Sequence, residues 1–187
     1  MYSVQGSRRD PLALRHSAVA FWLVAVGTLA ADQITKSIVR ARMLPGESIP
    51  LVQDVFHLTY VRNSGAAFGL FPGRQPVFML TTAVVLLVIA AYWRRSRPTA
   101  WPIVVALGLI SAGALGNLLD RLLSGRVTDF FDFTLIDFPV FNIADSGIVV
   151  GVGILIAWLL LVPEDPHDSG SRVDSSAGRA SASEVDR

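Results

Sequence analysis

Four long apolar runs constrain this chain more than any other feature of its sequence. They cover residues 17–36, 75–93, 101–119 and 143–162. Because an α-helix rises about 1.5 Å per residue, each run is long enough to cross a hydrocarbon core of about 30 Å. With 187 residues, 52% of them hydrophobic, the chain is too apolar for an ordinary soluble domain and too short for two large domains. We predict an all-α membrane protein with four transmembrane helices, formed by residues 1–162.

The basic residues predict how these helices are oriented. One group of them lies before the first run, at Arg8, Arg9 and Arg15, and another lies between the second and third runs, at Arg94, Arg95 and Arg97. Short cytoplasmic loops carry an excess of Lys and Arg, so both groups belong on the cytoplasmic side. We therefore expect both termini in the cytoplasm, and residues 37–74 and 122–142 at the outer face.

The two outer segments differ in composition. Residues 51–61 are rich in β-branched and aromatic side chains and lie between Pro50 and Gly65, which predicts a small β element. Residues 124–140 mix Asp with many Phe, a composition typical of an interfacial segment whose rings lie among the headgroups. This segment would cover the outer end of the bundle.

The remaining composition excludes several classes of function. A net charge of +1 gives no reason to expect nucleic-acid binding, and a chain without cysteine has no disulfide, thiol nucleophile or cysteine-bound metal. The three histidines are far apart, so we expect no metal and no cofactor. Residues 163–187 are polar and too poor in apolar side chains to fold, and we predict a disordered cytoplasmic tail.

Charged and amide side chains gather at one depth, the outer end of the predicted helices. They are Asp32, Lys36, Asn117, Asp120, Arg121, Asp129, Asn142 and Asp145. Such residues are costly in a membrane and usually mark a functional site. Their convergence at one depth therefore predicts an active or binding site at the outer face.

Each part of this group also has an ordinary structural interpretation. Asp32 and Lys36 are four residues apart, as in a helical ion pair whose Lys snorkels outward. Asn142 and Asp145 have the spacing of a capping box, and Asp120 with its neighbour could be a charge pair at a helix end. None of these interpretations predicts that all the groups share one depth.

Two carboxylates in one partly desolvated site can hydrolyse a peptide bond. Because both cannot easily ionise at close range, one remains protonated and polarises the carbonyl while the other takes a proton from water. Spacing alone leaves four candidates for such a pair, namely Asp32, Asp120, Asp129 and Asp145.

Three other classes of protein also fit parts of the pattern. In a serine/lysine peptidase Lys36, the only lysine, would activate Ser64 or Ser146, but Asp32 one turn away disfavours the neutral lysine that this requires. A transporter or proton pathway would need polar residues through the depth of the membrane, which the second and fourth runs lack at their centres. A scaffold protein would leave the acids unexplained.

Five short blocks, taken in order, resemble the lipoprotein signal peptidase family, also called signal peptidase II. They are DQITK at 32–36, NSGAAF at 63–68, GNLLDR at 116–121, VTDF at 127–130 and FNIAD at 141–145. Two departures are small, since Ser64 stands where Thr is commoner and Thr128 stands where Val is commoner. Neither changes the acidic residues.

The resemblance implies an aspartic endopeptidase of the bacterial plasma membrane whose catalytic pair is Asp129 and Asp145. Its substrates would be prolipoproteins carrying diacylglycerol on a cysteine, cut just before that cysteine, and its other partner would be membrane lipid. An acid beside Arg121 tends to stay ionised, which suits Asp120 to an orienting role. We expect a monomer. The substrate-binding or supporting residues would be Asp32, Lys36, Asn63, Gly65, Ala66, Asn117, Asp120, Arg121, Asn142 and Ala144.

Overall fold

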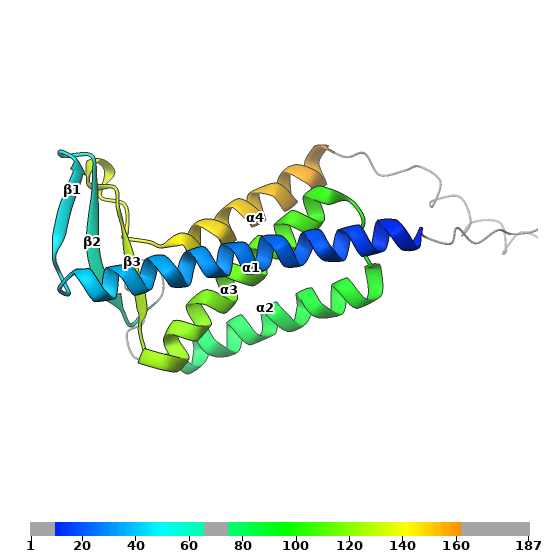
Figure 1. Ribbon diagram of the computed structural model, residues 1–187, viewed down its shortest axis with the longest axis horizontal. Coiled ribbons are helices and arrows are strands. Elements are labelled where there is room, and N and C mark those ends of the chain that lie inside the picture. Colours follow the sequence, from blue (N-terminus) through cyan, green and yellow to red (C-terminus); the bar gives the residue numbers. More distant parts are fainter. Residues whose placement is uncertain (1–9, 66–74, 162–187) are drawn as a thin grey trace, which may run out of the picture.

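Four helices form an elongated bundle with a small sheet at one end (Figure 1). The computed structural model describes residues 10–65 and 75–161. The helices are α1 (Pro11–Arg42), α2 (Gln75–Ser96), α3 (Trp101–Ser124) and α4 (Ile143–Leu161); the strands are β1 (Ser48–Val52), β2 (Phe56–Asn63) and β3 (Val127–Asp132), and a 3-10 turn, η2 (Thr134–Ile136), follows β3. All four helices are long and apolar enough to cross a membrane, which confirms the predicted fold class. The predicted disordered tail lies outside the described residues.

Helix α1 extends beyond the predicted span at both ends. At its start the Asp10 side chain accepts a hydrogen bond of 2.9 Å from the Leu12 amide, and Pro11 occupies the first turn, where its missing N–H costs nothing. In its last turn the positive charges of Arg40 and Arg42 interact favourably with the negative end of the helix dipole. The apolar run marks only part of this helix, and its last turns continue as far as the sheet (Figure 1).

Helix α3 is the centre of the bundle and packs against the other three helices. Small residues allow the close approach. A Cβ at Gly113 would collide with the Ala144 carbonyl of α4, and one at Gly151 would lie 2.8 Å from the Ala106 carbonyl of α3. Helix α2 is attached mainly through α3 and buries only Ile89.

The predicted β element is a hairpin, and the chain adds a third strand to it. Strands β1 and β2 are joined by a turn in which Asp54 has a positive φ of 59°, and the sheet order is β1-β2-β3, antiparallel throughout. Strand β3 lies in the segment that we expected at the interface. It pairs Asp129 with Val61 and Val127 with Asn63. This register places Asp129 close to the end of β2.

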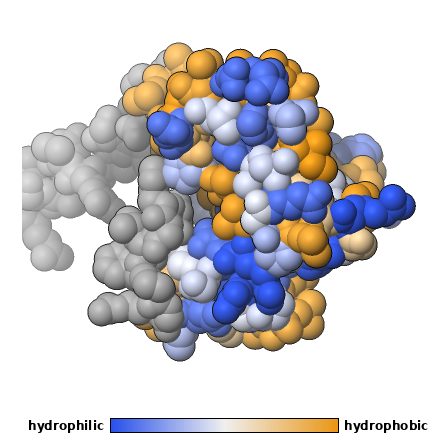
Figure 2. All heavy atoms as spheres, turned by 90° about the vertical axis from the view of Figure 1, so that its left-hand side faces the viewer, coloured by the Kyte–Doolittle hydropathy of each residue, from blue (hydrophilic) through white to orange (hydrophobic). Residues whose placement is uncertain are grey.

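The sheet is attached to the bundle through a small apolar core. Val39 and Met43 at the end of α1 pack against Tyr60 of β2 and Phe130 of β3. After β3, the exposed large side chains Phe133, Leu135, Ile136 and Phe138 keep the apolar character that we expected of an interfacial segment. Figure 2 looks onto this end of the molecule, where hydrophilic and hydrophobic side chains share one face.

The two glycines of α4 at positions 151 and 153 provide a matched test of helix packing. Gly151→Ala places a methyl group against backbone atoms of α3, so we expect it to lower the stability of the fold by about 1–3 kcal/mol. Gly153→Ala adds a methyl group in open space and should not destabilise the protein. Unfolding of both variants in the same detergent measures the difference, and equal stability would contradict the packing described above.

Candidate active site

The polar residues predicted from the sequence meet at the sheet end of the bundle, around a fully buried lysine. Lys36 has no exposed surface, and its Nζ lies 2.9 Å from Asp32 Oδ2 and 3.2 Å from Asp120 Oδ2. The same Nζ donates a hydrogen bond of 2.9 Å to Asn117 Oδ1. Three acceptors thus match the three protons of the ammonium group. The snorkelling interpretation is therefore wrong, because Lys36 points into the bundle.

Asp32 connects three helices. Its Oδ2 binds Lys36, and its Oδ1 accepts a hydrogen bond of 2.9 Å from the backbone amide of Ala144, in the first turn of α4. A Cβ at position 116 of α3 would lie 2.5 Å from Asp32 Oδ2, so Gly116 leaves the space for this carboxylate.

Asp120 fixes the start of β3. Its Oδ2 accepts a hydrogen bond of 3.0 Å from the Thr128 amide, and its Oδ1 lies 3.3 Å from Nη1 of Arg40. The interpretation of Asp120 and Arg121 as a charge pair is not what the structure has, since the cations that hold Asp120 come from α1. Neighbouring positions on a helix point about 100° apart, which separates the two side chains.

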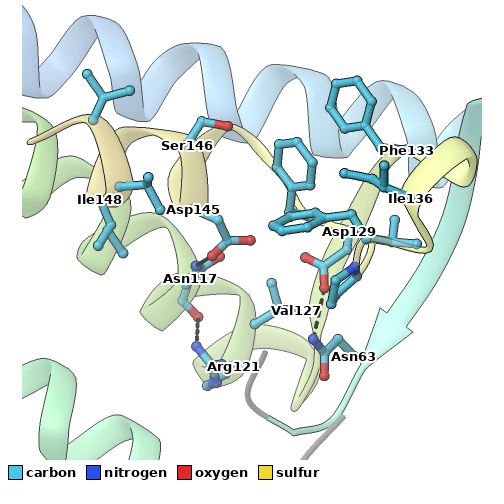
Figure 3. Close-up of a pocket in the computed structure, with 16 residues that line it drawn as sticks. Asn63, Asn117, Arg121, Val127, Asp129, Phe133, Ile136, Asp145, Ser146 and Ile148 are labelled. Atoms are coloured by element: carbon cyan, nitrogen blue, oxygen red, sulfur yellow. Dashed lines mark hydrogen bonds between the residues drawn. The ribbon is translucent and has the colours of Figure 1, made fainter. Parts of the chain in front are cut away.

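Arg121 instead reaches toward the end of β2. Its Nη1 donates to the Asn117 carbonyl and its Nη2 to the Gly65 carbonyl, each at 3.3 Å, and its guanidinium stacks over the ring of Phe78, 5.4 Å from the centroid. Gly65 also donates its amide to Asn63 Oδ1 at 2.9 Å. Arg121 thus holds the end of β2 beside the pocket (Figure 3). Ala66 lies outside the described residues.

Asp129 and Asp145 point toward one another into a single pocket, one from β3 and the other from α4 (Figure 3). Asp129 is only 2% exposed. Its two oxygens accept hydrogen bonds from the side-chain amides of Asn63, at 2.9 Å, and Asn142, at 2.6 Å. Asp145 Oδ1 accepts a hydrogen bond from the side-chain amide of Asn117 at 2.7 Å. Three asparagines therefore orient the two carboxylates.

Asn142 and Asp145 also form the predicted capping box. Asn142 Oδ1 accepts a hydrogen bond from the backbone amide of Asp145 at 2.9 Å, and Asp145 Oδ2 accepts one from the backbone amide of Asn142 at 3.2 Å. This reciprocal pair satisfies two backbone donors at the start of α4. The capping interpretation is confirmed, and Asn142, which caps α4, also donates a side-chain hydrogen bond to Asp129.

The surroundings of Asp129 favour its protonated form. Burial is the largest cause and the charge of Asp145 the second, and together they raise the pKa of Asp129 to about 6. The hydrogen bonds from Asn63 and Asn142 and the charge of Lys36 act in the opposite direction and limit the rise in this pKa. Asp129 can therefore gain or lose a proton near neutral pH.

The pocket between the acids has a volume of about 630 Å³ and a largely apolar wall. The wall comes from the segment after β3 and from α4, through Phe133, Ile136, Phe138, Phe141, Ile148 and Val149. Among residues 10–65 and 75–161, no group of three or more His, Cys, Asp or Glu side chains could hold a metal ion. The pocket suits a substrate with a polar bond at the acids and apolar groups around it.

The serine/lysine interpretation has no geometric support at Ser146. The Ser146 hydroxyl lines the pocket but donates to the Asn142 carbonyl at 2.9 Å. Lys36 Nζ points to the carboxylates of Asp32 and Asp120 and to Asn117 Oδ1 rather than to the Ser146 hydroxyl.

Sequence reasoning missed Arg40. It completes the buried network through Asp120 and also donates to the Thr128 hydroxyl at 3.2 Å. The signal that could have found it is its spacing, because Asp32, Lys36 and Arg40 follow one another at intervals of four on a single face of α1.

Together, the fold and the pocket define a polytopic membrane protein with a carboxylate pair at one end of a four-helix bundle. The family model described as signal peptidase (SPase) II matches residues 24–161. This chain belongs to the signal peptidase II family, and it is accordingly a multi-pass bacterial membrane protease.

Individual relatives agree with this family. The chain is similar to proteins named lipoprotein signal peptidase from Brevibacillus brevis, with 48% identity over 75% of this chain and 95% of the relative, and from Halothermothrix orenii, with 44% identity over 74% and 93%. The relative of the same name from Bacillus subtilis is 39% identical over 81% of this chain and 96% of its own.

Two solved structures, titled as bacterial membrane enzymes determined by the in meso method, also share the fold. The first has a TM-score of 0.72 and 37% identity over 76% of this chain and 88% of that chain. The second has a TM-score of 0.71 and 36% identity over 78% and 95%.

Loss of the buried lysine should be the most destabilising change in this network. Lys36→Met leaves Asp32 and Asp120 facing each other without their shared cation, so we expect a loss of about 3–5 kcal/mol of folding free energy. Arg40→Met is the matched control. Its side chain is 35% exposed, and its removal leaves Asp120 with Lys36 and the Thr128 amide, so the expected loss is below about 1 kcal/mol. Equal losses in denaturant unfolding would contradict this assignment.

Proposed function

We propose that this chain is an aspartic endopeptidase in which Asp129 and Asp145 form the catalytic pair. As a member of the signal peptidase II family, it removes signal peptides from prolipoproteins. The observation that carries the aspartic mechanism is the convergence of two carboxylates in one apolar pocket, each oriented by asparagine donors.

The pair can cleave a peptide bond without another reactive group. The ionised carboxylate removes a proton from water, and the resulting hydroxide attacks the carbonyl carbon of the scissile bond. The protonated carboxyl donates to the carbonyl oxygen, which stabilises the charge that develops there. The C–N bond then breaks, the leaving amine takes a proton from the pair, and the acid and base are regenerated. A raised pKa of Asp129 supports this sharing of one proton.

The pocket wall supports a lipid-modified substrate. Ile148 lines the pocket, and the next residue, Val149, both lines it and is 71% exposed on the surface of α4. An apolar path therefore connects the acids with the bilayer. We propose that the diacylglyceryl chains on the substrate cysteine lie along this path, while residues 133–140 cover the scissile bond, just before that cysteine.

The other predicted residues have supporting roles in this proposal. Lys36, Asp32 and Asp120 fix the ends of α1, α3 and α4, and the Ala144 amide joins them through Asp32. The asparagines at 63, 117 and 142 orient the acids, and Arg121 with Gly65 shapes the pocket edge. One chain supplies every group named, so we propose that the enzyme acts as a monomer.

The arginines at the end of α2 support an outward-facing site. The start of α1 and the end of α4 lie at the opposite end of the bundle from the sheet, together with the end of α2 at Arg94 and Arg95 (Figure 1). The positive-inside rule assigns that end to the cytoplasm. We propose that both termini are cytoplasmic and that the acids lie near the outer membrane surface.

Cleavage of a diacylglyceryl-modified prolipoprotein in detergent tests the pair. Asp129→Asn and Asp145→Asn remove one titrating group each, so we expect each to lower the cleavage rate by at least about a hundredfold. Asp54→Asn, at an exposed turn outside the pocket lining, is the matched control and should cleave at the normal rate. A folded Asn variant at either pocket position that cleaves normally would refute the assignment.

The pH dependence tests the shared proton. Below its pKa of about 6, Asp129 keeps a proton; above it, Asp129 ionises and the pair loses this general acid, so we expect kcat/KM to fall as pH rises through this pKa. Asn63→Leu removes a hydrogen bond that lowers the pKa of Asp129, and the fall should move to higher pH. Asp54→Asn should leave the profile unchanged. A fall that stays in place, or moves to lower pH, in Asn63→Leu would contradict this role.

A further inference from the structure

A second opening lies between α1 and α2, at the opposite end of the bundle from the acids. Its deeper part is an apolar groove of about 360 Å³ lined by residues of α1, α2 and α3. Its other part is a polar recess of about 470 Å³ lined by Leu14, Trp93, Arg94, Arg97 and Pro98. Trp93 and Arg94 line both parts, so the two adjoin.

The groove exists because α2 is attached to only one side of the bundle. Helix α2 packs against α3, whereas α1 and α2 have hardly any close backbone contact. Their side chains nevertheless meet at one point, where the rings of Phe21 and Trp93 lie 4.6 Å apart between centroids. Below this aromatic pair the groove continues between Ala25 of α1 and Leu86 of α2 toward the middle of the bundle.

The positive charge of the recess is exposed and concentrated. Arg94 and Arg97 are both exposed side chains at its wall, and Arg95 beside them is exposed but lines neither cavity. Arg97 ends α2 in a left-handed conformation with φ 42°, and its amide donates to the Trp93 carbonyl at 2.9 Å. The helix end thus brings two guanidinium groups to the mouth of an apolar groove. Guanidinium groups bind phosphate through paired N–H donors.

We propose that this opening binds one anionic phospholipid, with its phosphate on Arg94 and Arg97 and one acyl chain in the groove between α1 and α2. Both parts are needed to specify this occupant, since the charge selects an anionic headgroup and the apolar groove selects a chain. The groove residues from Phe21 to Leu29 span about 12 Å of helix, the depth of the upper part of one acyl chain. Basic recesses between transmembrane helices commonly hold such lipids.

This lipid would stabilise the position of α2 by packing against it. It would fill the space that α1 leaves on that side, and its removal would expose the weakly attached helix. The inference does not depend on the chemistry of the carboxylate pair, which lies at the other end of the bundle (Figure 1).

Native mass spectrometry of the full chain, released from detergent with added lipid, tests the proposal. The probes are phosphatidylglycerol and phosphatidylcholine with identical acyl chains. Two arginines near the headgroup attract the anionic lipid, so we expect at least about a tenfold preference of the wild type for it. The double variant Arg94→Gln/Arg97→Gln should lose that preference, whereas Arg95→Gln, which removes a like charge outside the recess, should keep it within about twofold.

A second pair of variants tests the groove. Ala90→Trp fills it and should reduce binding of both lipids, and Val88→Trp on the exposed face of α2 should not. Peptidase activity and a normal unfolding transition establish that each variant is folded. The proposal is overturned if the wild type binds both lipids equally, if Arg95→Gln loses the preference as fully as the double variant, or if Ala90→Trp binds lipid normally. It is also overturned if glycerophosphoglycerol, the headgroup without chains, competes as well as the intact lipid.

Discussion

The burial of one ammonium group determines the arrangement of this protein around its pocket. A lysine without exposed surface is tolerated only where its charge is paired and its protons are accepted, and Lys36 meets both conditions through two carboxylates and an amide. Its partners come from α1 and α3, and the two carboxylates also bind other elements. Asp32 binds the first turn of α4, and Asp120 binds the first residues of β3. The two elements that carry the acids of the pocket are therefore fixed to the same buried cation.

Asparagines connect this buried network with the pocket. Asn117 accepts from Lys36 and donates to Asp145, and Asn142 donates to Asn117 and to Asp129. An amide can accept and donate at once, so it can join a charged structural centre to a titrating carboxylate without adding a charge. This explains why the residues that orient the pair are amides, and why Asp129 can keep a raised pKa although a lysine lies in the same network.

Much of this arrangement was predictable from the sequence, and the failures have definite physical causes. The four helices follow from apolar length, and the depth of the polar residues predicted which of them meet. Pairing between them could not be predicted, because adjacent positions such as Asp120 and Arg121 point in different directions on a helix and find partners on other elements. The strand at 127–132 was missed because its residues are covered on several sides and lack the alternation of a half-exposed strand. The capping box was recognised, but the hydrogen bond from Asn142 to Asp129 also requires β3 to lie beside it.

The two acids of the pocket belong to elements of different kinds, one a strand and the other the first turn of a membrane helix. A chain whose helices have entered the bilayer, but whose sheet has not yet formed, holds Asp145 without Asp129 in front of it. The proposed catalytic pair is therefore complete only when β3 is paired with β2. Under the proposed aspartic mechanism, a chain that lacks this sheet has only one of the two acids in position, so peptidase activity should appear only with the complete fold.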